Sequence, residues 1–287
     1  MSISEQLLKK IESLPTLPIV VTRIMQLVEN PKTAAVEISK VVSLDPALTV
    51  KILKIVNSAY YGFPKQITTI THAIMILGFE DVKNLALSVS VFDIFKGKAV
   101  KDAVAFDRTA LWTHMIAVGV CTKILAKRLR LKNPEEAFIC GLLHDMGKII
   151  LDQYFHEDFN KVITCVQEEN LLFFNAEKKC IEVDHTEIGR IVAKKWGLPQ
   201  CIVDCAAYHH IPTTPNENSL LVSLVHASDV FVRIQKIGNG GDPLVPQLQK
   251  LAWDNLRMQP TDLAKVYEEL HEEVKKASAF MEFTKSA

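Results

Sequence analysis

Five histidines and two aspartates in the second half of the chain form an ordered set of potential metal ligands: His114, His144, Asp145, His185, His209, His210 and Asp229. Neutral imidazole and carboxylate groups suit iron, manganese or zinc, whereas a set without thiolate disfavours an iron–sulfur cluster. Seven candidates exceed the ligands of one tetrahedral ion, and the second oxygen of Asp145 could bridge two ions. The pattern therefore predicts a centre of one or two divalent transition-metal ions.

Helices can bring these residues together. Successive groups of candidates are about 20 to 40 residues apart, so the chain can leave on one helix and return on another, as in the metal sites of helical bundles. Apolar residues recur with a helical period, and 11 glycines and 12 prolines are few for 287 residues. We expect an all-α fold in which His144 and Asp145 lie inside one continuous helix. The helices that carry ligands are expected over residues 107–130, 134–154, 184–196, 199–210 and 217–237.

The same periodicity divides the chain into three regions. The N-terminal region, residues 1–100, is expected to be a bundle of helices over residues 3–13, 18–29, 33–43, 45–58, 68–78 and 79–95. The polar stretch 96–102 predicts the boundary with the central region, residues 101–240, which holds the metal ligands and a further helix over 157–170. The C-terminal region, residues 241–287, follows a flexible glycine-rich turn at 238–243 and is expected to pack on the rest as helices over 246–257 and 261–283. The link between the N-terminal and central regions has no long Gly/Ser tract, so we expect these regions to pack together.

Composition limits the cellular partners. Lys+Arg 33 and Asp+Glu 33 balance to zero net charge, which disfavours a protein built to coat nucleic acid or an anionic membrane. No basic leader followed by an apolar stretch and no run of about 18 apolar residues occurs, so we expect neither a signal peptide nor a membrane span. The six cysteines contain no C-x-x-C pair, which indicates free thiols in a reducing cytoplasm.

Several weaker motifs leave alternatives open. His226, three residues before Asp229, could replace one of the ligands. Cys201, Cys205 and His209 share a helix face and could form a mixed site, although buried thiols explain the cysteines better. Residues 33–58 could form a helix-turn-helix, but Lys51 and Lys54 are few for phosphate contacts. The aromatic turn of Tyr60, Tyr61 and Phe63 could be a partner site, although a plug in the core fits it better.

The segment His144-Asp145-Met146-Gly147-Lys148, with His114 before it and Asp229 after it, resembles the HD superfamily of metal-dependent phosphohydrolases. The additional His185 and His209-His210 resemble the HD-GYP branch, whose members hydrolyse cyclic dinucleotides at two- or three-metal sites. The resemblance implies that iron is the first metal to consider, that Asp145 and Lys148 act in catalysis, and that Lys148 holds a substrate phosphate. A plain ion pair between Lys148 and Asp152, one helical turn further on, is the alternative.

The N-terminal region resembles an HDOD domain, an HD-related output domain of bacterial signalling proteins. The motifs are Leu14-Pro15-Thr16-Leu17-Pro18, the run from Ile38 to Leu48, Asn57-Ser58-Ala59-Tyr60-Tyr61-Gly62, and the run from Ile70 to Gly78. HDOD proteins generally have an eroded metal set and no established activity, whereas this chain retains the full pattern. It departs from HD-GYP proteins at residues 211–215, where the Glu and the Gly-Tyr-Pro loop are missing, and at Ala110, where a three-metal member can place a carboxylate. We therefore expect no third metal and little activity on cyclic-di-GMP.

Two functions follow from these resemblances. The first is a cytoplasmic signal-transduction module with an HD-type metal site, a signalling protein as partner and a phosphate or nucleotide as candidate ligand. The alternative is an active metal-dependent phosphohydrolase or phosphodiesterase that acts on a nucleotide or cyclic dinucleotide. Neither function requires a membrane or nucleic acid.

Overall fold

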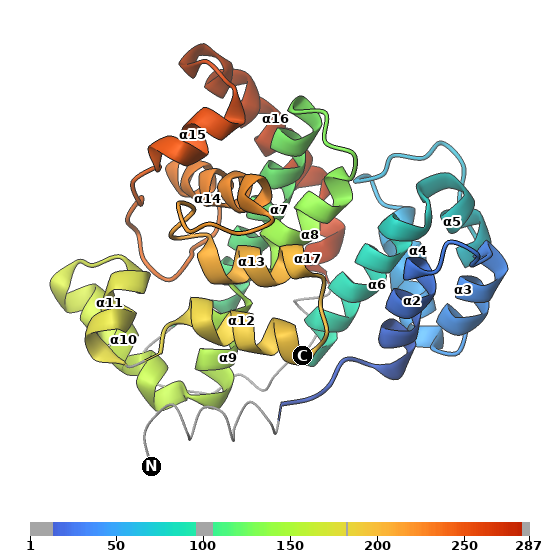
Figure 1. The fold of residues 1–287 in the computed structure, drawn as a ribbon, viewed down its shortest axis with the longest axis horizontal. Coiled ribbons are helices and arrows are strands. Elements are labelled where there is room, and N and C mark those ends of the chain that lie inside the picture. Colours follow the sequence, from blue (N-terminus) through green and yellow to red (C-terminus); the bar gives the residue numbers. More distant parts are fainter. Residues whose placement is uncertain (1–13, 96–105, 182, 283–287) are drawn as a thin grey trace. The chain divides into compact units, whose positions relative to one another are not determined.

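The computed structural model describes residues 14–95, 106–181 and 183–282, and every regular element among them is a helix (Figure 1). No strand occurs in these described ranges. The expected all-α class is therefore confirmed.

The described chain divides into two compact units. The larger unit contains Leu14 and residues 106–271, and the smaller unit contains residues 15–95 and 272–282. The division falls within α16 (Leu263–Lys276), so the C-terminal helices are shared between the two units.

The smaller unit is a bundle of helices that begin where the capping residues predict. Asp45 accepts a hydrogen bond from the Leu48 amide at 3.0 Å, and Thr69 accepts one from the His72 amide at 3.2 Å. The expected helices from 18 to 95 are confirmed within two residues at most ends, whereas the expected helix over 3–13 and the boundary at 96–102 lie outside the described residues. The unit consists of α2 (Ile19–Glu29), α3 (Ala35–Val42), α4 (Pro46–Val56), α5 (Ile70–Leu77), α6 (Phe79–Ile94) and α17 (Ser278–Met281).

Side chains that suggested other roles in this unit take part in its packing. Lys51 pairs with Asp93 at 2.5 Å and Lys54 pairs with Glu282, so both lysines of the possible DNA-reading helix are engaged. Tyr60 is buried and packs edge-to-face on two other aromatic rings. The aromatic turn therefore contributes Tyr60 to the core of this unit, as the packing interpretation predicts.

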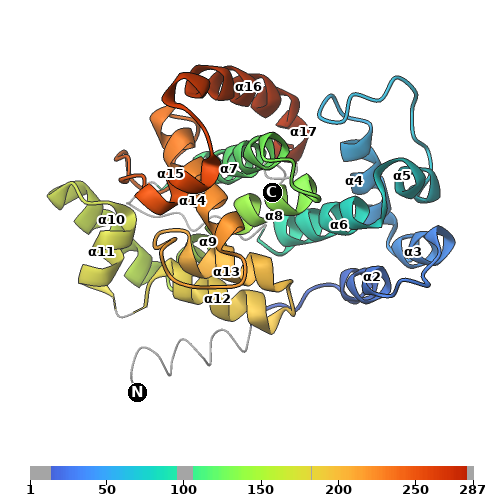
Figure 2. The ribbon, with the colours of Figure 1, turned by 45° about the horizontal axis from the view of Figure 1, so that its top comes forward.

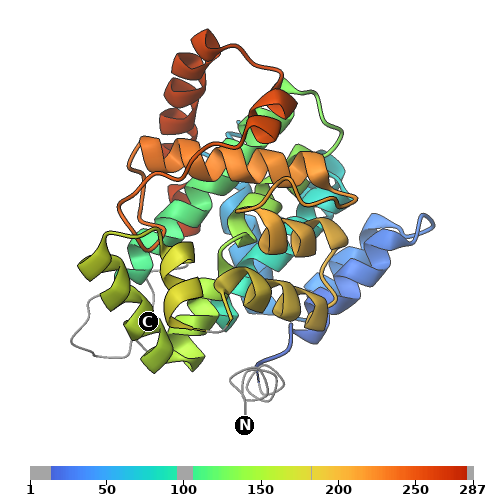
Figure 3. The same ribbon diagram turned by 60° about the vertical axis from the view of Figure 1, so that its left-hand side comes forward.

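The larger unit is built around the long helix α7 (Arg108–Arg128), which packs against α8 (Pro134–Leu143) and α14 (Ser219–Ile234). A second group of neighbours comprises α9 (Met146–Tyr154), α12 (His185–Lys195) and α13 (Gln200–Tyr208) (Figure 2). Figure 3 shows α14, in orange, running above α13. Helix α13 joins the two groups, because it contacts α8 and α14 as well as α12. The remaining elements are α10 (His156–Glu169), α11 (Phe173–Cys180), α15 (Lys250–Leu256), a short 3₁₀ helix (Pro260–Asp262) and most of α16.

The structure corrects four expectations in the larger unit and the C-terminal helices. The expected continuous helix 134–154 is broken at His144 and Asp145, which separate α8 from α9. Helix α11 is absent from the expected elements. The expected helix 246–257 begins only at Lys250, and the expected helix 261–283 is interrupted at Ala277. The break at His144-Asp145 matters most, because it places two candidate ligands on a turn between helices.

Helix α7 is long and apolar enough to cross a membrane by length and composition, but 78% of the relevant window is buried inside the protein. It packs against α8 and α14 and carries the buried polar residue His114. These are the properties of the central helix of a folded domain.

Candidate metal centre

The larger unit brings all seven candidate ligands to one region. His114 lies in the middle of α7, His144 and Asp145 form the turn between α8 and α9, and His185 is the first residue of α12. His209 and His210 follow the last turn of α13, and Asp229 lies on α14. Four helices and the turn between α8 and α9 therefore contribute to a single cluster.

Asp145 lies at the centre of this cluster and is fully buried. Its Oδ1 atom lies 3.2 Å from His185 Nε2 and 3.5 Å from His209 Nε2. Its Oδ2 atom lies 3.3 Å from His144 Nε2 and 3.8 Å from His114 Nε2. The two oxygens thus face two different groups of histidines, which is the arrangement that a bridging carboxylate needs.

The first group comprises Asp145, His185, His209 and His210, whose ligand atoms all lie within 4.8 Å of one another. His185 Nε2 is 3.4 Å from His209 Nε2 and 3.1 Å from His210 Nε2. Ligands bound at about 2.0–2.1 Å to a tetrahedral or octahedral ion lie roughly 3.0–3.4 Å apart. The observed separations fit a transition-metal ion.

The second group comprises His114, His144 and Asp145, and Asp229 adjoins it with its Oδ1 atom 3.1 Å from His114 Nε2. Across both groups, three buried atoms have no hydrogen bond with another described residue: His114 Nε2, His144 Nε2 and Asp145 Oδ1. Leaving a buried polar atom without a partner costs about 1–3 kcal/mol. A cation bound in this cluster could satisfy all three atoms.

Hydrogen bonds behind the histidines fix which nitrogen is available to a metal. His144 Nδ1 donates to the carbonyl of Gly141 at 2.7 Å, and His209 Nδ1 donates to the carbonyl of Cys205 at 3.0 Å. A carbonyl can only accept, so these Nδ1 atoms carry the protons and the Nε2 lone pairs face the cluster. These rings therefore present the nitrogen that a metal ion could bind.

Glu177, on the unexpected helix α11, makes a similar hydrogen bond behind His185. It is fully buried, and its carboxylate accepts hydrogen bonds from His185 Nδ1 at 2.5 Å and from the His185 amide at 2.9 Å. A carboxylate in this position orients the imidazole and raises its basicity, as it does behind histidines that bind metals. Sequence reasoning missed Glu177 because helix α11 was not expected and because its partner, His185, lies on another helix.

Arg233 and Asp242 were also missed. Arg233 Nε donates to Asp229 at 2.9 Å, and its Nη1 atom donates to both oxygens of Asp242, at 3.1 and 3.0 Å. Asp242 in turn accepts from the Phe173 amide at 2.9 Å. The spacing of four residues between Asp229 and Arg233 was a signal that could have found this pair.

Comparison with known proteins assigns the family. A model of the HDOD domain matches residues 14–212, which is more than half of the chain. The chain belongs to the HDOD family. An uncharacterized protein of Treponema pallidum (strain Nichols) is 29% identical to it over 226 residues, which cover 78% of this chain and 43% of the relative. The chain thus spans less than half the length of that relative.

Solved structures share the fold of this HDOD protein. An HDOD domain protein of unknown function from Geobacter sulfurreducens has a TM-score of 0.78 and 26% identity, and the match covers 96% of each chain. A candidate phosphohydrolase from Shewanella amazonensis SB2B has a TM-score of 0.73 and 23% identity over 97% of each chain. A candidate signal transduction protein from Marinobacter aquaeolei VT8 has a TM-score of 0.78 and 20% identity, covering 100% of this chain and 62% of the other. The last two show the fold alone.

Lys148 of this HDOD protein is fully buried inside the cluster. Its Nζ atom donates to Asp145 Oδ2 at 2.7 Å and to the carbonyl of Gly240 at 2.7 Å. Asp152, the expected alternative partner, instead pairs with Arg108. The glycine-rich turn at 238–243 is therefore anchored to the centre through Gly240.

The two remaining alternatives for ligands lie outside the cluster. His226 Nδ1 donates to the carbonyl of His209 at 2.7 Å, and His226 Nε2 accepts from the Gln249 amide at 3.1 Å, so both ring nitrogens are used. Cys201 lies 3.6 Å from Glu136, and neither it nor Cys205 belongs to a potential metal-binding group in the described residues. His209 faces Asp145 instead.

The ionisable groups in the centre shift one another's pKa values. Burial disfavours ionisation of Asp145, but His144 and Lys148 keep the pKa of its carboxyl well below its usual range. Burial acts likewise on Asp229, and Arg233 and His114 hold the pKa of that carboxyl well below its usual range. Burial lowers the pKa of His209 to about 4. Burial also opposes the charge on His185, yet the Glu177 carboxylate beside it raises the pKa of His185 to about 9.

These shifts predict that the metal-free protein is most stable near pH 6.5. The unfolded chain protonates His209 below about 6.5, whereas the folded chain resists this until about pH 4, so stability falls on acidification through this range. The raised pKa of His185 stabilises the fold at low pH, and this contribution is lost as the pH rises from about 6.5 through about 9. Urea unfolding of chelator-treated protein should show a loss of about 2 kcal/mol or more between pH 6.5 and pH 5, because burial also lowers the pKa of His210. The exposed His271→Gln variant should show the same loss, and a constant stability over this range would contradict the prediction.

Proposed function

We propose that this HDOD protein is a signal-transduction protein whose HD-type centre holds one or two transition-metal ions, with iron as the first candidate and manganese or zinc as the others. The ligands in this proposal are His114, His144, Asp145, His185, His209, His210 and Asp229. The observation that carries it is the cluster of ligand atoms around Asp145, all from buried residues except the half-buried His210, with His144, His185 and His209 oriented by Glu177 and by backbone carbonyls. The description of the Marinobacter neighbour supports signalling, and a protein partner in the cytoplasm is included in the proposal.

The surroundings of the ligands favour a sensory or structural role over rapid turnover. His114, His144 and Asp145 are each at most 1% exposed, and His185 and His209 are fully buried. The only lysine in the described cluster is already bound to Asp145 and Gly240, so it has no free charge for a substrate phosphate. A metal in such a closed centre can hold α7, α9, α12, α13 and α14 in one arrangement that a partner recognises.

Metal analysis tests this proposal directly. We expect protein purified without oxygen to hold one or two ions of iron, manganese or zinc per chain. Adding the same ion to chelator-treated protein at about 100 times its Kd should stabilise the fold by about 2.7 kcal/mol and raise the Tm by several degrees. A Cys201→Ser variant is the control and should retain its metal, because Cys201 lies outside both groups of ligands.

Two results would contradict the proposal of a metal centre. One is protein that contains no metal after anaerobic purification, and the other is a Tm that does not respond to any of the three ions. Loss of metal in Cys201→Ser but not in His144→Ala would show that the cysteine side of α13 holds the ion instead.

The second candidate function is a metal-dependent phosphohydrolase, which the complete ligand set favours. Such ions lower the pKa of bound water and polarise a phosphoryl oxygen. In this function Asp145 would bridge the ions, and Lys148 would exchange its bond to Gly240 for one to a substrate phosphate. We expect the metal-loaded protein to hydrolyse neither bis-p-nitrophenyl phosphate nor cyclic-di-GMP. Hydrolysis that is lost in His144→Ala would promote this function over signalling.

A further inference from the structure

A pocket of the larger unit lies where helices α7 and α15 both end. Its volume is about 410 Å³, and none of the candidate metal ligands lines it. Three arginines do line it: Arg128 and Arg130 at the end of α7, and Arg257 directly after α15. This feature is called the arginine pocket below.

Two of the three guanidinium groups in the arginine pocket have no partner in the described chain. Arg128 pairs with Glu269 through its Nη2 atom at 3.3 Å. The side chains of Arg130 and Arg257 are exposed and form no hydrogen bond or ion pair with another described residue. The pocket therefore presents two positive charges that the fold leaves unpaired.

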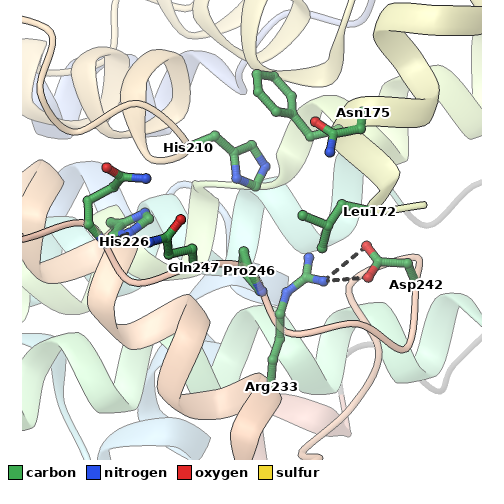
Figure 4. A pocket seen from close by; sticks show the side chains of 10 residues that line it. Leu172, Asn175, His210, His226, Arg233, Asp242, Pro246 and Gln247 are labelled. Carbon is green, nitrogen blue, oxygen red and sulfur yellow. Dashed lines mark hydrogen bonds and ion pairs between the residues drawn. The ribbon is translucent and has the colours of Figure 1, made fainter. Parts of the chain in front are cut away.

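Arg233 shows how this fold holds an arginine that it uses in its own structure. Its Nη1 atom donates to both oxygens of Asp242, as the dashed lines in Figure 4 show, and its Nε atom donates to Asp229. The two free guanidinium groups of the arginine pocket have no such carboxylates beside them. They are available to an anion from solution.

The backbone at the same two arginines is in a conformation that favours glycine. The φ angle is 56° at Arg130 and 50° at Arg257, in the left-handed region where a Cβ atom is crowded. After α7 the Leu131 amide donates to the carbonyl of Ala126 at 2.9 Å, which is the helix ending that usually has glycine at this position. An arginine kept at such a position without a partner points to a function beyond the fold.

Arginines near helix C-termini also offset the partial negative charge of the last carbonyls. Lys236 after α14 provides this kind of charge outside the arginine pocket. Its φ angle is 53°, and the Ile237 amide donates to the carbonyl of Val232 at 3.2 Å, so the helix ends in the same way as α7. Lys236 is therefore a matched residue that separates a role at a helix end from ligand binding.

The charges and the walls of the arginine pocket define the chemistry of its ligand. Two free guanidinium groups match a phosphate monoester, which carries about two negative charges at neutral pH, and arginine suits paired hydrogen bonds to phosphate. Asp262 is the one carboxylate in the lining, and its Oδ2 atom already accepts from the Gln259 amide at 2.9 Å. Leu129 and Met258 add apolar surface beside the charges.

The volume of the arginine pocket restricts the ligand to a small molecule. A water molecule takes about 30 Å³ in the liquid, so about 410 Å³ corresponds to roughly fourteen waters. This space admits a phosphate group together with an apolar group of the size of an aromatic ring.

We propose that the arginine pocket binds a small organic phosphate, a phosphate monoester with an apolar portion. Arg130 and Arg257 hold the phosphate, and the apolar portion lies against Leu129 and Met258. This site is independent of the metal centre and of the function proposed for that centre.

Calorimetric titration of the protein with phenyl phosphate tests the proposal. We expect a Kd of about 1 mM or tighter, and inorganic phosphate, which lacks the apolar group, should bind several-fold more weakly. Arg130→Gly and Arg257→Gly should each weaken the binding of phenyl phosphate about tenfold, the effect of losing one hydrogen bond to a charged group. The Tm of each variant should equal or exceed that of the parent, because glycine is favoured at a left-handed position.

Lys236→Gly is the matched control, since it removes the same charge from the same backbone conformation outside the arginine pocket. It should bind phenyl phosphate like the parent. Equal weakening in Lys236→Gly and in the two arginine variants would show a general attraction by positive charge and overturn the proposal. Unchanged binding in both arginine variants would do the same, as would a parent protein that binds no phenyl phosphate or binds inorganic phosphate more tightly.

Treatment with a chelator separates the arginine pocket from the metal centre. Metal-free protein should still bind phenyl phosphate, and this result supports the pocket even if the metal centre is wrong. Binding that disappears with the metal would place the phosphate at the metal centre and overturn the proposal for the pocket alone.

Discussion

We expect Asp145→Ala to abolish metal binding and to lower the free energy of unfolding of the metal-free protein by about 3–5 kcal/mol, the usual cost of removing one partner of a buried ion pair. Asp145 is fully buried, and its Oδ2 atom is the carboxylate partner of the buried Lys148 ammonium at 2.7 Å. Without it, Lys148 retains only the carbonyl of Gly240. The same substitution removes the one residue that both groups of ligands share.

A double variant separates the two consequences. Asp145→Ala with Lys148→Met removes the unpaired charge together with the carboxylate, so most of the lost stability should return in urea unfolding. The metal should remain absent, because the bridging ligand is still missing. Mass spectrometry should therefore find no metal in either variant. Urea unfolding of the chelator-treated protein should find the double variant more stable than Asp145→Ala.

Asp204→Ala is the matched control, because Asp204 is also buried but only accepts hydrogen bonds from the amides of Gln200 and Asn218. It should lose about 1–3 kcal/mol and keep its metal. A full complement of metal in Asp145→Ala would show that the ions are held without this carboxylate, and the bridging arrangement would have to be abandoned.

The elements that sequence predicted well are those whose ends are set by local chemistry. Asp45 before Pro46 caps α4, and Asp184 accepts from the amides of Thr186 and Glu187 at 3.0 Å to begin α12. These interactions lie within a few residues of one another, so a short stretch of sequence contains them completely. The ordered histidines and aspartates likewise predicted which residues meet, because their types rather than their neighbours define the pattern.

The break between α8 and α9 could not be predicted in this way. Residues from Ala137 to Leu151 are buried on all sides, so the apolar pattern runs through His144 and Asp145 without a gap. Contacts from distant helices decide the local conformation there, since Asp145 faces His185, His209 and His114. Glu177 escaped prediction for the same reason, because its partner His185 is on another helix.

Gly147 gives the second large effect, because α9 and α12 touch there without room for a side chain. A Cβ atom on Gly147 would lie 2.0 Å from the carbonyl oxygen of His185 and 3.0 Å from the amide nitrogen of Gly189. Both obstacles are backbone atoms and cannot rotate away. We expect Gly147→Ala to lower the free energy of unfolding by about 3 kcal/mol or more, at the upper end of the cost of overpacking.

Gly189→Ala is the control at the same crossing. Its Cβ atom would meet Ala206 at 3.4 Å and Gly147 at 3.7 Å, which are ordinary contacts. Alanine is favoured over glycine inside a helix by up to about 1 kcal/mol, so this variant should be as stable as the parent or more stable. Urea unfolding of the two variants compares the space available for the same Gly→Ala change on the two sides of the crossing. Similar stability of Gly147→Ala and Gly189→Ala would contradict the close approach.

The effect of Gly147→Ala should extend to the metal, because the crossing sets the distance between two candidate ligands of the first group, Asp145 and His185. Asp145 immediately precedes α9, and His185 begins α12, with Asp145 Oδ1 and His185 Nε2 only 3.2 Å apart. A new methyl group against the His185 carbonyl pushes these two residues apart, and metal bonds of about 2.0–2.2 Å tolerate little displacement. Gly147→Ala should therefore bind metal more weakly, in contrast to Gly189→Ala. In this chain the glycine of the His-Asp-Met-Gly-Lys segment is thus required by the contact between two helices, in addition to any role in the chemistry of the centre.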